Sequence, residues 1–115
     1  MRLLDANVDV HLARTLTDFG VPCDTAANRG WKALGNGDLV ATAFDAGFRC
    51  LLTRDQLFGE SAARALKDYP GFAVVVVNLP QRRSGEYQQA FAAAWALYPI
   101  VPLAGFLIHW PPARP

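Results

Sequence analysis

Three aspartates stand at points of the chain where parallel α/β proteins place ligand-binding side chains. Asp5 follows the apolar pair Leu3–Leu4, Asp38 precedes an apolar helical pattern, and Asp55 follows a short apolar run. If these runs belong to one parallel sheet, the three carboxylates gather at its carboxyl edge, where such sheets bind ligands. Crowded carboxylates raise one another's pKa unless a cation compensates them. Oxygen donors without His or Cys favour Mg²⁺ or Mn²⁺, which can activate water for phosphodiester cleavage.

The stretch 38–59, DLVATAFDAGFRCLLTRDQLFG, predicts a helix, a stop, a buried strand and an acidic loop in succession. Asp38 is expected to be the N-cap of the helix, and Gly47 to end it in the left-handed conformation. The apolar run Cys50–Leu52 is too short for a helix and is typical of a strand covered on both faces. The polar loop that follows leads to Asp55.

Strands and helices are expected to alternate through the rest of the chain. The patterns predict strands over 2–5, 21–26, 72–77 and 106–110, and helices that end at Gly20, cover 60–69, and begin at Ser84. Asn7 or Asp9 is a suitable cap for the first helix. This alternation predicts an α/β fold, a three-layer α/β/α Rossmann-like domain with a mostly parallel central sheet.

Polar and basic side chains near the same edge are expected to bind the substrate, the arginines through its phosphates. Arginine suits phosphate because its guanidinium presents several donors in a fixed plane. The residues expected to bind substrate are Asn7, Thr53, Arg54, Arg82 and Arg83. Trp31, in a glycine-rich loop, is suited either to stacking on a base or to packing against the core. Both histidines, His11 and His109, are interpreted as structural.

Composition limits the class of protein. The chain has 115 residues, 52% of them hydrophobic, with a formal net charge of +1. This length predicts a single domain over residues 1–110 with a frayed tail at 111–115. A net charge this small does not give the whole protein the positive potential that attracts nucleic acid.

The two cysteines, Cys23 and Cys50, lack CxxC spacing and are expected to be reduced core residues. No apolar run approaches a membrane span, and a cytoplasmic location is expected.

The chain resembles the PIN-like domain family, related to PIN-domain ribonucleases and to the toxins of toxin–antitoxin pairs. The resemblance rests on LLD at the first strand, the helix between Asp38 and Gly47, the run LLTRD, and the Phe-Gly that follows. It implies a metal-dependent endoribonuclease with Mg²⁺ or Mn²⁺ at Asp5, Asp38 and Asp55. The expected partners are single-stranded or structured RNA and an antitoxin protein, and no membrane.

Departures from the family pattern support an alternative function. Ala6 stands where relatives commonly have Glu, Leu57 stands where they often have an acid, and residues 25–37 contain no acid. A catalytically degenerate PIN-like scaffold that binds RNA or a protein partner is the alternative. A receiver-like phosphoacceptor ranks third, because no Lys follows Lys67 to serve a later strand end. The aromatic residues of the C-terminal third could support a homodimer, although a core role is their default.

Overall fold

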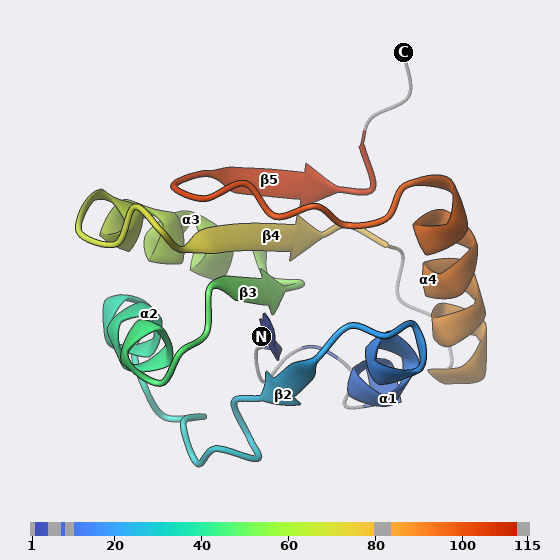
Figure 1. Cartoon of the computed structure of the whole chain (residues 1–115), viewed down its shortest axis with the longest axis horizontal. Coiled ribbons are helices and arrows are strands. Elements are labelled where there is room, and N and C mark those ends of the chain that lie inside the picture. Colours follow the sequence, from blue (N-terminus) through green and yellow to red (C-terminus); the bar gives the residue numbers. More distant parts are fainter. Residues whose placement is uncertain (1, 5–7, 9–10, 80–83, 113–115) are drawn as a thin grey trace.

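The structure describes part of the chain, and only predictions about these residues can be compared with it. A computed structural model describes residues 2–4, 8, 11–79 and 84–112 (Figure 1). Four of the predicted site residues lie outside these ranges, namely Asp5, Asn7, Arg82 and Arg83. The two proposed caps of the first helix, Asn7 and Asp9, and the end of the predicted tail also lie outside them.

Five parallel strands form the central sheet. They are β1 (Arg2–Leu4), β2 (Cys23–Thr25), β3 (Cys50–Thr53), β4 (Ala73–Val77) and β5 (Leu107–Trp110), in the spatial order β2-β1-β3-β4-β5 (Figure 1). Every residue of β3 and β4 is buried, because both faces of the sheet are covered by helices. The short edge strand predicted near Val21 is β2. The predicted α/β fold with a parallel sheet is confirmed.

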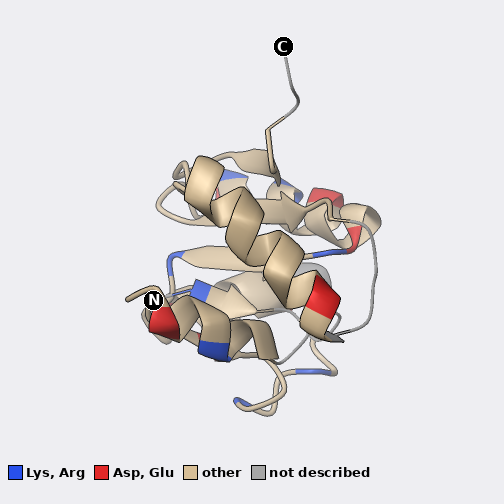
Figure 2. Ribbon diagram, turned by 90° about the vertical axis from the view of Figure 1, so that its right-hand side faces the viewer, with Lys and Arg blue, Asp and Glu red and all other residues tan. Residues whose placement is uncertain are grey.

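Helices cover both faces of the sheet, which gives the three layers. They are α1 (His11–Asp18), α2 (Asn36–Asp45), α3 (Gln56–Arg64) with the 3₁₀ turn η1 (Ala65–Lys67), and α4 (Ser84–Leu97). On one face Leu12 and Leu16 of α1 join Phe91 of α4 in a core with Leu4 and Leu52. Figure 2 shows α4 and α1 together in front of the sheet. A second core, on the opposite face, holds α2 and α3.

Glycines end two helices as the sequence predicts. Gly20 after α1 has a φ of 80° and Gly47 after α2 has a φ of 97°, a region that favours glycine because it carries no Cβ. In the described ranges, no helix is both long enough and apolar enough to cross a membrane.

Two predicted helix starts are wrong. The N-cap of α2 is Gly35, and Asp38 lies inside the first turn. Glycine is an acceptable N-cap, so the helix begins before the first acid. The helix predicted over 60–69 begins at Gln56, because the Asp55 side chain caps it, and it tightens into η1 at Ala65.

Candidate functional site

The chain changes direction across the sheet at β1. From β1 it passes through α1 to β2 on one side, and from β2 it returns through α2 to β3 on the other side of β1. Because α1, which follows β1, and α3, which follows β3, cover opposite faces, the chain leaves these two adjacent strands in opposite directions. Such a switch point, between β1 and β3, is where doubly wound sheets bind ligands.

Asp55 follows β3 at this edge and is held by its surroundings. Its backbone N–H donates to Oγ1 of Thr53 at 3.1 Å, and its Oδ1 accepts the N–H of Phe58 at 3.1 Å. The side chain is therefore the N-cap of α3. The residue is exposed, and in the described part of the chain its Oδ2 has no hydrogen-bond donor. One carboxylate oxygen thus caps the helix, on a residue that is exposed to solvent.

Asp38 lies at the same end of the neighbouring helix. It belongs to the first turn of α2 and is exposed, and α2 packs beside α3. In a parallel sheet a helix that follows a strand is expected to start toward the strand's carboxyl end, so the topology predicts that both first turns face this edge. A carboxylate in a first turn is also stabilised by the positive end of the helix dipole.

Thr53 and Arg54 leave β3 toward opposite faces. Thr53 is fully buried on the α3 side, where its methyl group would lie 3.4 Å from a Cβ placed at Gly59. The Arg54 guanidinium lies 4.9 Å from the ring centroid of Tyr87 on α4. In this arrangement Thr53 positions Asp55, and Arg54 lies half-buried against an aromatic face. A substrate-binding role for either residue stays a prediction.

The remaining site residues predicted from the sequence fall outside the described ranges. Asp5 is the residue after Leu4 in the chain, and Asn7, Arg82 and Arg83 belong to segments that the structure does not describe. Within the described ranges, no group of three or more His, Cys, Asp or Glu side chains could hold a metal ion. The gathering of Asp5, Asp38 and Asp55 into one site therefore stays a prediction.

A pair that sequence reasoning missed lies at the carboxyl ends of β4 and β5. Nδ2 of Asn78 lies 3.1 Å from Nδ1 of His109, and both residues are exposed. His109 is paired in register with Val76, which is paired with Thr53. His109 is therefore in register, across β4, with Thr53 of the candidate site. No sequence signal links the two residues, because they become neighbours only through strand pairing.

Asp24 organises the loop between β2 and α2. Its carboxylate accepts the backbone N–H of Thr25 and Nδ2 of Asn28, both at 2.8 Å, and Nε of Arg29 at 2.6 Å. Partial burial would raise the pKa of Asp24, but hydrogen bonds from Arg29, Asn28 and Thr25 outweigh it and lower that pKa. Arg29, one of the basic residues of this loop, is therefore occupied by an ion pair.

Trp31 packs against the protein. Its ring meets the Phe48 ring edge to face, with 5.9 Å between centroids, and it is partly buried against the core beneath α2. The described arrangement favours the packing role over base stacking.

No protein-family model, curated protein or solved structure matches this chain.

Proposed function

We propose that this chain is a metal-dependent ribonuclease of PIN-like type, the toxin of a toxin–antitoxin pair, with Asp5, Asp38 and Asp55 as the metal-binding residues. The observation that supports it most is that Asp38 lies in the first turn of α2 and Asp55 caps α3, two helices that pack against each other. In this proposal, acids that stand far apart in the sequence share the carboxyl edge of the sheet, where the topology favours a ligand.

The donor set fits a hard cation. Asp55 is exposed and caps α3 through Oδ1, so its second oxygen could bind an ion while the cap is kept. Carboxylate oxygens suit Mg²⁺ and Mn²⁺, and Asp38 and Asp55 are both exposed. When bound, the ion would lower the pKa of the attacking water and stabilise the leaving oxygen.

The protein's own residues would hold Asp55 in place and provide positive charge for the substrate phosphate. Thr53 and Phe58 fix Asp55 through the two hydrogen bonds at its backbone and side chain. Arg54, next to Asp55 in the chain, is suited to a phosphate of the substrate. The antitoxin, in this proposal, covers the carboxyl edge and closes it to RNA.

The test is cleavage of single-stranded RNA with Mn²⁺, beside an EDTA control. Asp38→Asn should reduce cleavage by more than about 100-fold, because even residues that only support metal ligands cost 10–100-fold. The matched control is Asp45→Asn, which removes the same charge from the exposed last residue of the same helix. That variant should cleave like the wild type. Equal cleavage by Asp38→Asn and the wild type would overturn the metal-site assignment.

A non-catalytic scaffold that binds RNA or a protein is the second candidate. It is favoured by the structural roles that two of the site residues already fill, Asp55 as a helix cap and Arg54 against Tyr87. A folded protein that binds RNA without cleaving it, and whose melting temperature Mn²⁺ leaves unchanged, would support this candidate.

A further inference from the structure

Arg54 stands between two residues whose positions are fixed. Thr53, before it, is fully buried at the end of β3, and Asp55, after it, caps α3. Arg54 itself is half-buried, and its Nε atom is buried. The backbone therefore fixes where this side chain begins. The guanidinium, however, lies at the far end of a long and flexible chain of atoms, which loses much rotamer freedom when it is held in one place.

The ring of Tyr87 lies against this far end. Cζ of Arg54 is over the ring, 4.9 Å from its centroid, which is within the distance of about 6 Å at which a cation and an aromatic face attract each other. Tyr87 is 2% exposed and belongs to the core cluster that contains Leu52 of β3. Because side chains in a packed core have little freedom, the ring gives the guanidinium a fixed surface to lie on.

This contact joins the carboxyl end of β3 to the beginning of α4. Arg54 directly follows the last residue of β3, and Tyr87 is the fourth residue of α4. Figure 1 shows α4 on the side of the molecule toward which the arrows of β3, β4 and β5 point, and Figure 2, viewed from that side, shows α4 in front of the sheet. The pair therefore lies beside the carboxyl end of a central strand, where parallel sheets bind ligands.

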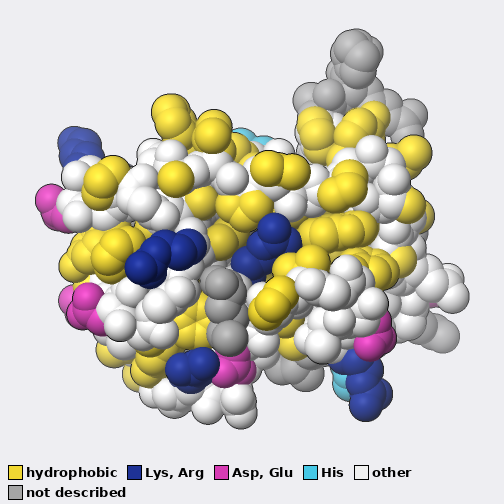
Figure 3. Space-filling view, in the orientation of Figure 1, with side chains coloured by type: hydrophobic (Ala, Val, Ile, Leu, Met, Phe, Trp, Pro, Cys, Tyr) yellow, Lys and Arg dark blue, Asp and Glu magenta, His cyan; other side chains and the backbone are white. Residues whose placement is uncertain are grey.

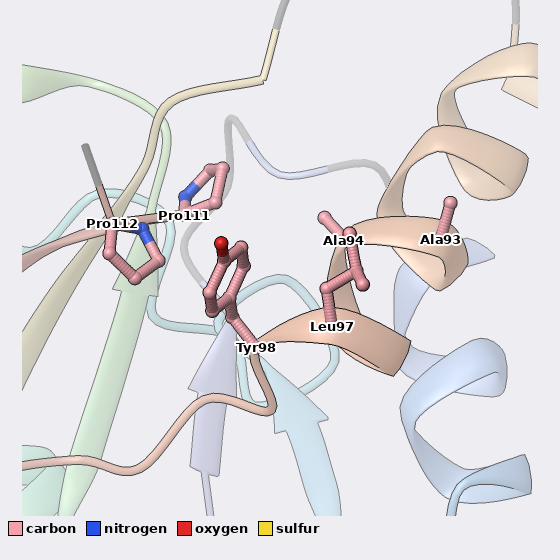
Figure 4. Close-up of a pocket in the computed structure, with 6 residues that line it drawn as sticks. All are labelled: Ala93, Ala94, Leu97, Tyr98, Pro111 and Pro112. Carbon is pink, nitrogen blue, oxygen red and sulfur yellow. The ribbon is translucent and has the colours of Figure 1, made fainter. Parts of the chain in front are cut away.

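Other parts of the described surface offer a polyanion little organised positive charge. Figure 3 shows Lys and Arg as separate side chains rather than as one patch on the face that it displays, and Arg29 is paired with Asp24. A surface cavity of about 240 Å³ at the other end of α4 has an uncharged lining (Figure 4), formed by Ala93, Ala94, Leu97, Tyr98, Pro111 and Pro112. Contacts with RNA phosphates therefore depend on single cations that are well placed.

We propose that Tyr87 is a positioning residue, which holds the Arg54 guanidinium for a phosphate of single-stranded RNA. The proposal rests on the proposed function in taking RNA as the ligand. The N–H donors of a guanidinium lie in its plane, so one edge can bind a phosphate while one face stays on the ring. A guanidinium that is already held in place loses less freedom when the phosphate binds, and this raises the affinity.

The test is the affinity of the whole chain for a short, fluorophore-labelled single-stranded RNA, measured by fluorescence anisotropy in EDTA so that metal-dependent cleavage is prevented. Arg54→Ala should raise the dissociation constant roughly tenfold, as expected for a lost hydrogen bond to a charged group. Tyr87→Leu should raise it about fivefold, and Tyr87→Phe, which keeps the aromatic face, by less than about twofold. If circular dichroism shows Tyr87→Leu unfolded, Tyr87→Met replaces it, because methionine packs adaptably and has no aromatic face.

The matched control is Phe91→Leu, the same kind of truncation one turn further along α4. Phe91 is fully buried in the same core cluster as Tyr87, and its ring packs against Trp95 and Trp110. This variant should lose stability but keep the dissociation constant within about twofold of the wild type. The double variant Arg54→Ala/Tyr87→Leu should bind no more weakly than Arg54→Ala alone, because Tyr87 acts through Arg54.

The proposal would be overturned by a wild type that does not bind the RNA, by equal weakening in Tyr87→Leu and Phe91→Leu, or by additive effects in the double variant. A Tyr87→Phe protein as weak as Tyr87→Leu would also overturn it, since the ring would then not be what matters. The proposed function fails separately, because its test is cleavage with Mn²⁺. The expected affinities without cleavage would keep Tyr87 as a positioning residue of an RNA-binding scaffold.

Discussion

Asp55 shows how one side chain can serve both folding and chemistry. Its Oδ1 accepts the Phe58 N–H and its backbone N–H donates to Thr53. The first interaction satisfies a donor that the start of α3 would otherwise leave without an intrahelical partner. A substitution that removes the carboxylate therefore mixes two effects, and only a variant that keeps the cap can separate them.

Asn and Asp are equally good N-caps, whereas Ala is a poor one. We therefore expect Asp55→Asn to keep the free energy of unfolding within about 0.5 kcal/mol of the wild type, and Asp55→Ala to lose about 1 kcal/mol. Both should abolish Mn²⁺-dependent RNA cleavage. Urea unfolding and the cleavage assay check the two readouts. An Asp55→Asn protein that is as stable and as active as the wild type would leave Asp55 as a helix cap only.

At the scale of elements, the contact between α3 and β4 depends on a missing side chain. Gly59 is buried in α3, and a Cβ built there would lie 2.6 Å from Cγ2 of Val76. No side-chain contact of ordinary length is that short, so the helix can approach the sheet this closely only with glycine. This approach sets where the first turn of α3, and with it Asp55, lies relative to the strands.

Gly59→Ala should lower the free energy of unfolding by about 1–3 kcal/mol, the usual cost of overpacking a core, although alanine is the better helix former. Gly37→Ala is the matched control, since Gly37 is also helical and a Cβ there would meet nothing within 4 Å. That variant should be neutral or more stable by up to about 1 kcal/mol. Urea denaturation of both proteins gives the comparison, and equal effects would show that the packing at Gly59 relaxes freely.

The elements were predictable where one residue type decides the outcome. The run Phe72–Val77 predicts β4, and Gly20 and Gly47 predict the ends of α1 and α2, because apolar β-branched runs and left-handed glycines have few other uses. The start of α2 was not predictable in the same way. Gly35 and Asp38 are both acceptable N-caps, and the choice between them depends on how the loop after β2 packs.

For the candidate site, the sequence predicts the topology but not the contacts. Parallel strands alone lead us to expect Asp38 and Asp55 at the carboxyl edge, and their gathering there stays a prediction. The Asn78–His109 contact does not, because it arises from the pairing of β4 with β5. The attachment of Arg54 to Tyr87 likewise depends on how α4 crosses the sheet. Contacts between distant segments require the register and the helix placement, and local sequence patterns contain neither.

The whole molecule is one sheet with helices packed on each face through apolar side chains. Its radius of gyration is 13.2 Å, as expected of a compact domain of this length. Cys50 lies on β3, which has β1 on one side and β4 on the other, and 2% of the residue is exposed. Fraying at an edge of the sheet does not reach it, so its thiol meets water when the molecule as a whole unfolds.

This burial makes Cys50 a reporter of global stability at alkaline pH. Burial raises the pKa of its thiol from 9.0 to about 12, although Arg2 and the N-terminus oppose the rise. The unfolded state therefore releases the thiol proton at lower pH than the folded state. It follows that the contribution of the protonated Cys50 thiol to the free energy of unfolding is complete below pH 9 and is lost as the pH rises toward 12.

Between pH 7 and pH 10 the wild type should lose about 1–2 kcal/mol through this one group. Cys50→Ala starts less stable because it leaves a cavity, but it lacks this pH dependence. The difference in unfolding free energy between the two proteins should therefore shrink by that amount as the pH rises. Urea denaturation in a reducing buffer at several pH values measures it. A constant difference would mean that the thiol ionises as readily in the folded protein as in the unfolded chain. That result would contradict the burial of Cys50 on β3 up to global unfolding.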